Sequence, residues 1–172
     1  MRKFILLIAF VQTAISIGSA QTNKYYSSVP SDSGTVYFIK PVQLRVKDKK
    51  DLAYTDWAVN YIREKKCASS VYMNFSIFTK NKPALSDSAY IIFNSGLKVK
   101  ADNFITEKQS KGTWKLRYTS NISLEDVKTL FNQEGEVLFE VMINDTPYYF
   151  LPTSKWKKSK AFMDDFIISL CE

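Results

Sequence analysis

Apolar and polar side chains alternate along most of this chain, and that period of two limits the possible fold more than any other feature. In VYMNFSIFT (71–79), Val71, Met73, Phe75 and Ile77 share one face, and the other face includes an asparagine and a serine. The same alternation returns in short segments from residue 35 to residue 151. A period of two is typical of strands that bury one face. The pattern predicts a mainly β protein with a minor α+β character.

Turn residues between these segments indicate how the strands are connected. Asn94-Ser95-Gly96 and Asn144-Asp145 each join two alternating segments and are typical of hairpins. Because hairpins place consecutive strands antiparallel, we expect an antiparallel β-sandwich or a rolled sheet. Pro41 has no N–H to donate, so segments 35–40 and 42–46 are predicted to lie at a sheet edge or to be broken there.

A short mid-chain helix is predicted where the period changes. Ser123 is the expected N-cap, and Glu125 and Asp126 place negative charge at the positive end of the helix dipole. The apolar residues that follow recur at helical spacing and would bury one stripe: Leu124, Val127, Leu130 and Phe131. We expect this helix to end near Gly135.

A second, amphipathic helix is predicted at the C-terminal end of the chain, packed on the sheet. Its apolar face consists of Phe162, Met163, Phe166, Ile167 and Leu170. Ser159 is the expected N-cap, because a start at Ser154 would put three lysines at the positive end of the helix dipole. The sequence therefore predicts a loop ahead of Ser159.

The strongest candidate for a binding surface is a basic cluster in and beside this loop: Lys155, Trp156, Lys157, Lys158 and Lys160. Such a cluster suits an acidic protein partner or an anionic envelope polymer. The net charge of +7 is a modest excess, and together with the expected export it disfavours nucleic acid as the partner. The alternative interpretation is a loop whose lysines are only solvated.

The N-terminal segment predicts export. A basic start is followed by the apolar run Phe4–Val11 and by small residues up to Ala20, which is the order of a signal peptide (1–20). The apolar run is shorter than the ~20 residues that span a bilayer, and no later run approaches that length. We expect residues 21–34 to be a flexible polar leader and residues 35–172 to be a single β-rich domain. The mature protein is then secreted or periplasmic and has no transmembrane segment.

Cys67 and Cys171 are the only cysteines in the sequence. In an oxidising compartment an even count favours a disulfide, which would tie the end of the last helix to the loop before segment 71–79. The alternative is a pair of separate thiols. Neither cysteine has a histidine partner or belongs to a C-x-x-C motif, so a catalytic role is disfavoured.

Composition excludes several kinds of catalytic site. The sequence has no histidine, which removes the usual Ser-His-Asp and Cys-His nucleophiles and imidazole zinc sites. Its five glycines are scattered singly, so there is no phosphate-binding loop, and we predict no cofactor and no metal. Adjacent carboxylates at 125–126 and 164–165 would point about 100° apart on a helix and do not converge.

These exclusions favour an exported, non-catalytic module that binds a macromolecular partner or an envelope component. One alternative is a small hydrolase or lyase that uses carboxylate, tyrosine and lysine side chains. Another is a secreted inhibitor or immunity-type protein that blocks a second enzyme with a protruding loop.

Overall fold

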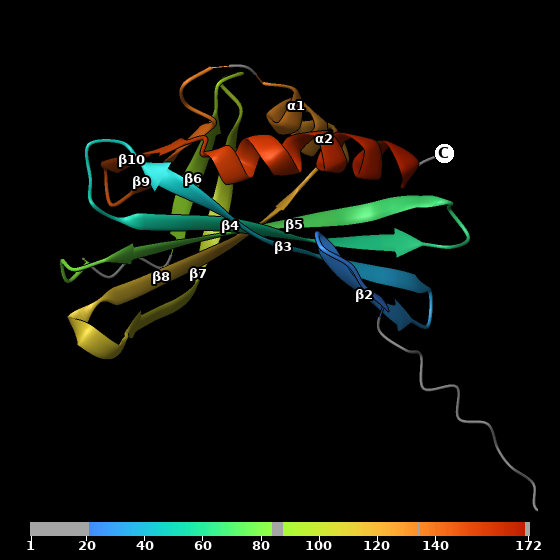
Figure 1. The fold of residues 1–172 in the computed structure, drawn as a ribbon, viewed down its shortest axis with the longest axis horizontal. Coiled ribbons are helices and arrows are strands. Elements are labelled where there is room, and N and C mark those ends of the chain that lie inside the picture. The colour runs from blue at the N-terminus through green and yellow to red at the C-terminus, as the bar shows by residue number, and fades with distance from the viewer. Residues whose placement is uncertain (1–20, 84–87, 134, 171–172) are drawn as a thin grey trace, which may run out of the picture.

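The structure is a computed structural model and describes residues 21–83, 88–133 and 135–170. Within these residues, ten strands form one antiparallel sheet, and α2 lies beside α1 and across β3 (Figure 1). The predicted class is confirmed: mainly antiparallel β, with one mid-chain and one C-terminal helix. The elements are β1 (Gln21–Thr22), β2 (Tyr26–Ser31), β3 (Gly34–Val46), β4 (Leu52–Ile62), β5 (Cys67–Thr79), β6 (Ser88–Phe93), β7 (Lys98–Lys108), η1 (Ser110–Gly112), β8 (Trp114–Ile122), α1 (Leu124–Asn132), β9 (Phe139–Ile143), β10 (Thr146–Leu151) and α2 (Ser154–Ser169).

The sheet closes on itself. Its strands follow the order β1-β2-β3-β10-β9-β6-β7-β8-β5-β4, and β4 also pairs with β3, so the strands from β3 to β4 form a ring. This is the rolled sheet that the alternation and the hairpins predict. Opposite walls of the ring pack face to face, as the layers of a sandwich do. Phe75 of β5 meets Phe150 of β10 across the interior, with ring centroids 5.9 Å apart.

The predicted strand faces are correct where the alternation is clearest. Val71, Met73, Phe75 and Ile77 are all buried on the inner face of β5. Two hairpins also form at the predicted turns, between β6 and β7 and between β9 and β10. Gly96 adopts a positive φ of 84° in the first of these turns, a conformation that glycine reaches without steric cost. Alternation and turn chemistry were therefore sufficient to place the inner face.

Pro41 marks a gap in the pairing of β3 rather than the end of a strand. β3 runs through the proline as one strand, and its register against β4 shifts between Ile39 and Val42. On its other side, β3 pairs with β2 up to Ile39 and with β10 only at Arg45 and Val46. Between these two partners no described strand needs the N–H that proline lacks, so β3 accommodates Pro41 without losing a ladder hydrogen bond.

The prediction of a flexible leader is wrong for residues 26–31. These residues form β2, which pairs with β3 along its whole length from Tyr26 to Ser31. Three serines make this segment polar in composition, and composition alone predicted a leader. The long neighbour β3 supplies the backbone partners that a short polar strand lacks on its own, so tertiary context overrides the local signal.

The start of α1 agrees with prediction. The Ser123 hydroxyl accepts a hydrogen bond from the backbone N–H of Asp126 at 3.1 Å, as an N-cap does. Val127, Leu130 and Phe131 are buried, and they form the stripe expected from their spacing. Helical period and cap chemistry therefore fix both the position and the orientation of this helix.

The predicted start of α2 is wrong, because the helix begins at Ser154 and not at Ser159. Thr153 caps it: its hydroxyl accepts from the N–H of Trp156 at 3.3 Å, and its carbonyl accepts from the N–H of Lys157 at 3.0 Å. Burial of the Trp156 side chain, which is 3% exposed, explains the early start. A buried aromatic contributes ~3 kcal/mol and each ring contact ~0.5–1.5 kcal/mol. Together these exceed the cost of exposed lysines at a helix start, ~0.3–1 kcal/mol each.

Candidate functional site

The first turn of α2 covers the gap in β3. The Thr153 hydroxyl donates to the backbone carbonyl of Gln43 at 2.5 Å, and Lys155 Nζ donates to the side-chain oxygen of the same glutamine at 2.9 Å. Gln43 lies in the part of β3 that has β4 on one side and no described strand on the other. The helix start thus replaces the missing strand and fixes the position of its own lysines.

A hollow of about 220 Å³ lies beside this contact, and we call it the lysine pocket. Its buried floor comes from Ile39, Val42 and Met163, which are 4%, 6% and 1% exposed. Four exposed lysines form its rim: Lys24, Lys40, Lys155 and Lys158. Tyr25, Pro41, Ser159 and Phe162 complete the lining. Among the described residues that line the pocket, none is acidic, so its charge is wholly positive.

Stacked aromatic rings hold one wall of the lysine pocket in place. The rings of Tyr25 and Phe162 lie 4.3 Å apart at an angle of 13°. The Asn23 side chain accepts hydrogen bonds from the backbone N–H groups of Tyr25 and Tyr26, at 2.7 and 2.8 Å. Lys40 Nζ donates to the backbone carbonyl of Asn23. The turn ahead of β2 is therefore tied to both β3 and α2, and it carries Lys24 to the rim.

A second basic hollow, which we call the turn hollow, lies on the other side of the α2 start. It has a volume of about 790 Å³ and is lined by residues of the β3–β4 turn, by Gly135 and Glu136, and by Lys157. Its cationic residues are Arg45, Lys47, Lys49, Lys50 and Lys157, and its acidic residues are Asp48 and Glu136. Burial lowers the pKa of Lys49, and the charge of Asp51 opposes this. Lys49 Nζ lies 3.4 Å from the centre of the Tyr148 ring, a cation–π contact.

The structure divides the five residues of the predicted basic cluster. Lys155 and Lys158 line the lysine pocket, whereas Lys157 lines the turn hollow. Lys160 borders neither hollow and interacts with Asp164, one helical turn further on. Trp156 belongs to the core, because it packs against Trp57 and Phe131, and it is not part of the surface.

Sequence reasoning missed Lys24 and Lys40, which complete the rim. Lys24 falls in the segment predicted to be a flexible leader, and Lys40 is an isolated lysine ahead of Pro41. Neither lies near residues 155–158 in the sequence, and no local pattern links them to α2. Only the pairing of β2 with β3, and the packing of α2 over the gap, brings the four lysines together.

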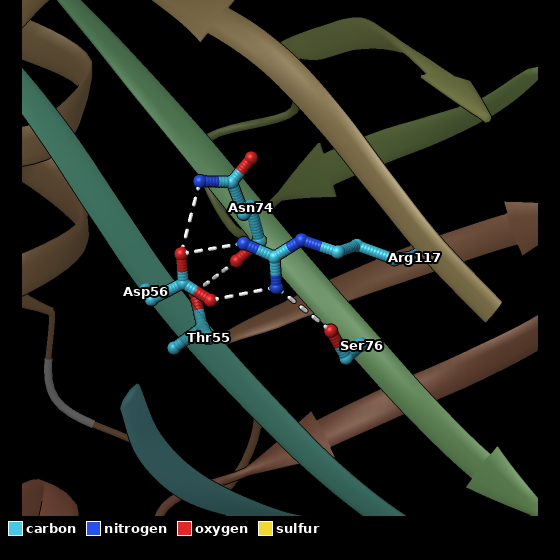
Figure 2. A network of polar contacts seen from close by, with 5 residues as sticks. All are labelled: Thr55, Asp56, Asn74, Ser76 and Arg117. Carbon is cyan, nitrogen blue, oxygen red and sulfur yellow. Dashed lines mark hydrogen bonds and ion pairs between the residues drawn. The ribbon is translucent and has the colours of Figure 1, made fainter. Parts of the chain in front are cut away.

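A separate polar cluster on the outer face of the sheet joins three neighbouring strands (Figure 2). Arg117 of β8 donates to both carboxylate oxygens of Asp56 on β4, at 2.8 and 2.9 Å, and also to the Ser76 hydroxyl at 3.0 Å. Asn74 of β5 donates to Asp56 at 3.0 Å, and its backbone carbonyl accepts from Thr55 at 3.0 Å. Since both oxygens of Asp56 are engaged with donors, the cluster is a cross-strand clamp and offers no free acid–base pair.

The adjacent carboxylates lie on the two helices, Glu125 and Asp126 in the first turn of α1 and Asp164 and Asp165 on α2. Asp126 accepts a hydrogen bond from the Ser123 hydroxyl at 2.6 Å and so belongs to the α1 cap. Glu125 is 83% exposed and pairs with Lys128 at 3.4 Å. Asp164 and Asp165 are consecutive on α2, and burial raises the pKa of Asp164. Across the same residues, no three potential metal ligands of the His, Cys, Asp or Glu type cluster.

Two predictions fall outside the described residues. These are the signal peptide (1–20) and the disulfide, since Cys171 and the side chain of Cys67 are not described. Both stay predictions. Among the helices that are described, none combines the length and the apolar character needed to cross a bilayer.

Comparison of the chain with protein-family models, with curated proteins and with solved structures found no match.

Proposed function

We propose that this chain is an exported, non-catalytic binding module for an anionic component of the cell envelope. One observation carries the proposal: two basic hollows flank the start of α2, with four lysines around one and five cationic residues around the other. Only two acidic residues, both in the turn hollow, oppose them among the described lining residues. The partner would lie across the first turns of α2 and contact both hollows.

Electrostatics supports an extended anionic partner. Clefts lined by charges of one sign concentrate counter-ions and steer them inward, and this attraction weakens as salt is added. The N-terminal end of α2 adds the positive end of a helix dipole between the hollows. Lysine ammonium groups on flexible stems suit a partner whose anionic groups do not have one fixed geometry.

The same cluster favours binding over catalysis. Acid–base catalysis needs groups that can take or give a proton near neutral pH, and these usually include a histidine or a carboxylate with a shifted pKa. The described lining of the lysine pocket has neither. The Asp56 carboxylate, which is drawn together with Arg117 in Figure 2, already accepts three hydrogen bonds, two of them from the Arg117 guanidinium.

Charge reversal tests the proposal. The triple variant Lys155→Glu, Lys157→Glu and Lys158→Glu alters both hollows, and we expect its binding to sedimented anionic envelope preparations to fall at least tenfold at low salt. The matched control is Lys65→Glu, Lys82→Glu and Lys108→Glu, which changes the net charge equally at exposed positions outside both hollows. Equal binding by the triple variant and the unmodified protein would refute the proposal.

A further inference from the structure

We infer that the lysine pocket takes an anionic amphiphile, in which a negatively charged headgroup lies among the four lysines and a short apolar segment enters between α2 and β3. The inference rests on the proposed function and specifies one ligand class for one of its two hollows. An anionic polymer would contact only the lysines at the rim of the pocket. An amphiphile would contact these lysines and also the apolar floor.

The floor of the pocket is suited to hydrocarbon. Ile39 and Val42 come from β3 and Met163 from α2, and all three are buried. Below the rim, the side chains that line the pocket are apolar or aromatic, apart from the hydroxyl groups of Ser159 and Tyr25. Water over this floor finds few polar partners, whereas a ligand segment that covers the floor removes apolar surface from water, which is favourable by ~25 cal/mol per Å². An alkyl or aromatic segment therefore matches the floor better than water does.

The size of the pocket limits the apolar segment. Pockets for drug-sized ligands measure about 300–1,000 Å³. At about 220 Å³, the lysine pocket has room for a short alkyl segment or a single ring. A longer chain would have to leave through the rim, so affinity should stop rising once the floor is covered.

The rim lysines are positioned yet still able to bind. Lys155 Nζ uses one donor on the Gln43 side chain, and Lys40 Nζ uses one on the carbonyl of Asn23. An ammonium group has three donors, so each of these lysines retains two for an anionic headgroup. Lys24 Nζ lies 5.3 Å from the centre of the Tyr25 ring, which places its charge beside the aromatic wall. Groups already held near their bound positions lose less entropy on binding.

A series of ligands with the unmodified protein provides the first test. Calorimetry would compare straight-chain carboxylates from acetate to decanoate, below their micelle concentrations, with the matching alkyl phosphates, inorganic phosphate and the neutral alcohols. We expect about fourfold tighter binding per added methylene until the floor is filled, and then a plateau. Alcohols of equal length should bind at least tenfold more weakly. The carboxylate and phosphate arms identify the preferred headgroup. An affinity that does not depend on chain length, or equal binding of alcohols, would overturn the inference.

A cavity-filling variant provides the second test. Ser159→Leu places three additional carbons in the pocket and changes no charge, so we expect octanoate binding to fall at least tenfold. Ser154→Leu is the matched control, because Ser154 is exposed on the same helix and lies outside the pocket. Thermal unfolding by circular dichroism would establish that both variants fold.

The two proposals fail in different ways. Unchanged octanoate binding by folded Ser159→Leu would refute the amphiphile site and leave the envelope-binding function in place. Unchanged envelope binding by the triple charge reversal would refute the function itself. In that case the calorimetric chain-length series with the unmodified protein would decide alone whether the amphiphile site exists.

Discussion

The ring of Trp156 lies parallel to the ring of Phe131, with centroids 5.0 Å apart and planes only 6° from each other. Both rings also contact Trp57, at 6.0 and 5.2 Å, so α2, α1 and β4 meet in one aromatic cluster. In the sequence, Trp156 lies between Lys155, which lines the lysine pocket, and Lys157, which lines the turn hollow. Its burial fixes which side of the helix Lys155 and Lys158 occupy, so a core contact sets the geometry of the surface.

Truncation of this contact should be costly. Trp156→Ala removes a side chain that is 3% exposed. We expect the free energy of unfolding, measured in urea, to fall by about 3–5 kcal/mol. Trp156→Phe retains a ring over Phe131, so its free energy of unfolding should fall by less. Because the tryptophan also positions the lysines, the Ala variant should bind octanoate more weakly even at temperatures where it is folded. A loss below ~1 kcal/mol would contradict the assigned role of the cluster.

The clamp of Asp56 and Arg117 should contribute to stability as a pair. Asp56→Asn and Arg117→Gln each leave the partner charge mostly buried and without its ion pair, and we expect each to lower the free energy of unfolding by about 1–3 kcal/mol. The double variant should cost less than the sum, with a coupling of ~0.5–3 kcal/mol. The exposed pair Lys100 and Asp102 serves as the control, with an expected coupling of ~0–1 kcal/mol. Additive effects at 56 and 117 would show that the clamp stabilises nothing.

Gly34, at the start of β3, should tolerate no side chain. A Cβ at this position would lie 1.9 Å from the backbone oxygen of Tyr61, and backbone cannot move aside as a flexible side chain can. We expect Gly34→Ala to lower the free energy of unfolding, measured by heat or urea, by ~3 kcal/mol or more. Gly96→Asn is the control, since that site is open and asparagine adopts positive φ readily. Similar stability of the two variants would indicate that β3 and β4 are further apart here.

Asp164 should make stability depend on pH. Burial raises its pKa, the charge of Lys160 opposes the shift, and Asp165 adds to it. Because the folded state holds the proton more tightly than the unfolded state, ionised Asp164 costs stability at neutral pH, and the cost vanishes below the unfolded pKa near ~3.9.

We therefore expect Asp164→Asn to raise the melting temperature at pH 7 and to lose this advantage as the pH falls towards about 3.5. Asp32→Asn removes the same charge from an exposed turn and serves as the control. An advantage for Asp164→Asn that grows in acid would reverse the sign of the assigned shift.

The sequence was informative wherever one local pattern decides the structure. Alternation identified the inner face of β5, and cap chemistry identified the start of α1. The sequence did not predict strand β2 or the start of α2 at Ser154, because contacts between distant residues outweigh local preference at both places. Lysines at a helix start are unfavourable by themselves, and a burial that the local sequence does not reveal compensates for them.

The candidate site was only partly predictable for the same reason. Two of its rim residues, Lys155 and Lys158, were found as a run of basic residues. Lys24 and Lys40 reach the site through strand pairing, and such pairing leaves no trace in a local window. The apolar floor was equally hidden, since Ile39 and Val42 look like ordinary strand residues.

The ring is sealed where β3 meets β10, through Val46 with Phe150 and Arg45 with Leu151. The hydrogen bond from Thr153 to Gln43, which supports this seam, joins residues 110 positions apart. Contacts this distant in sequence form slowly, because a long loop has to close before they contribute. During synthesis, the seam between β3 and β10 cannot form until residue 151 has been made, so the ring closes only after its last strand has been translated.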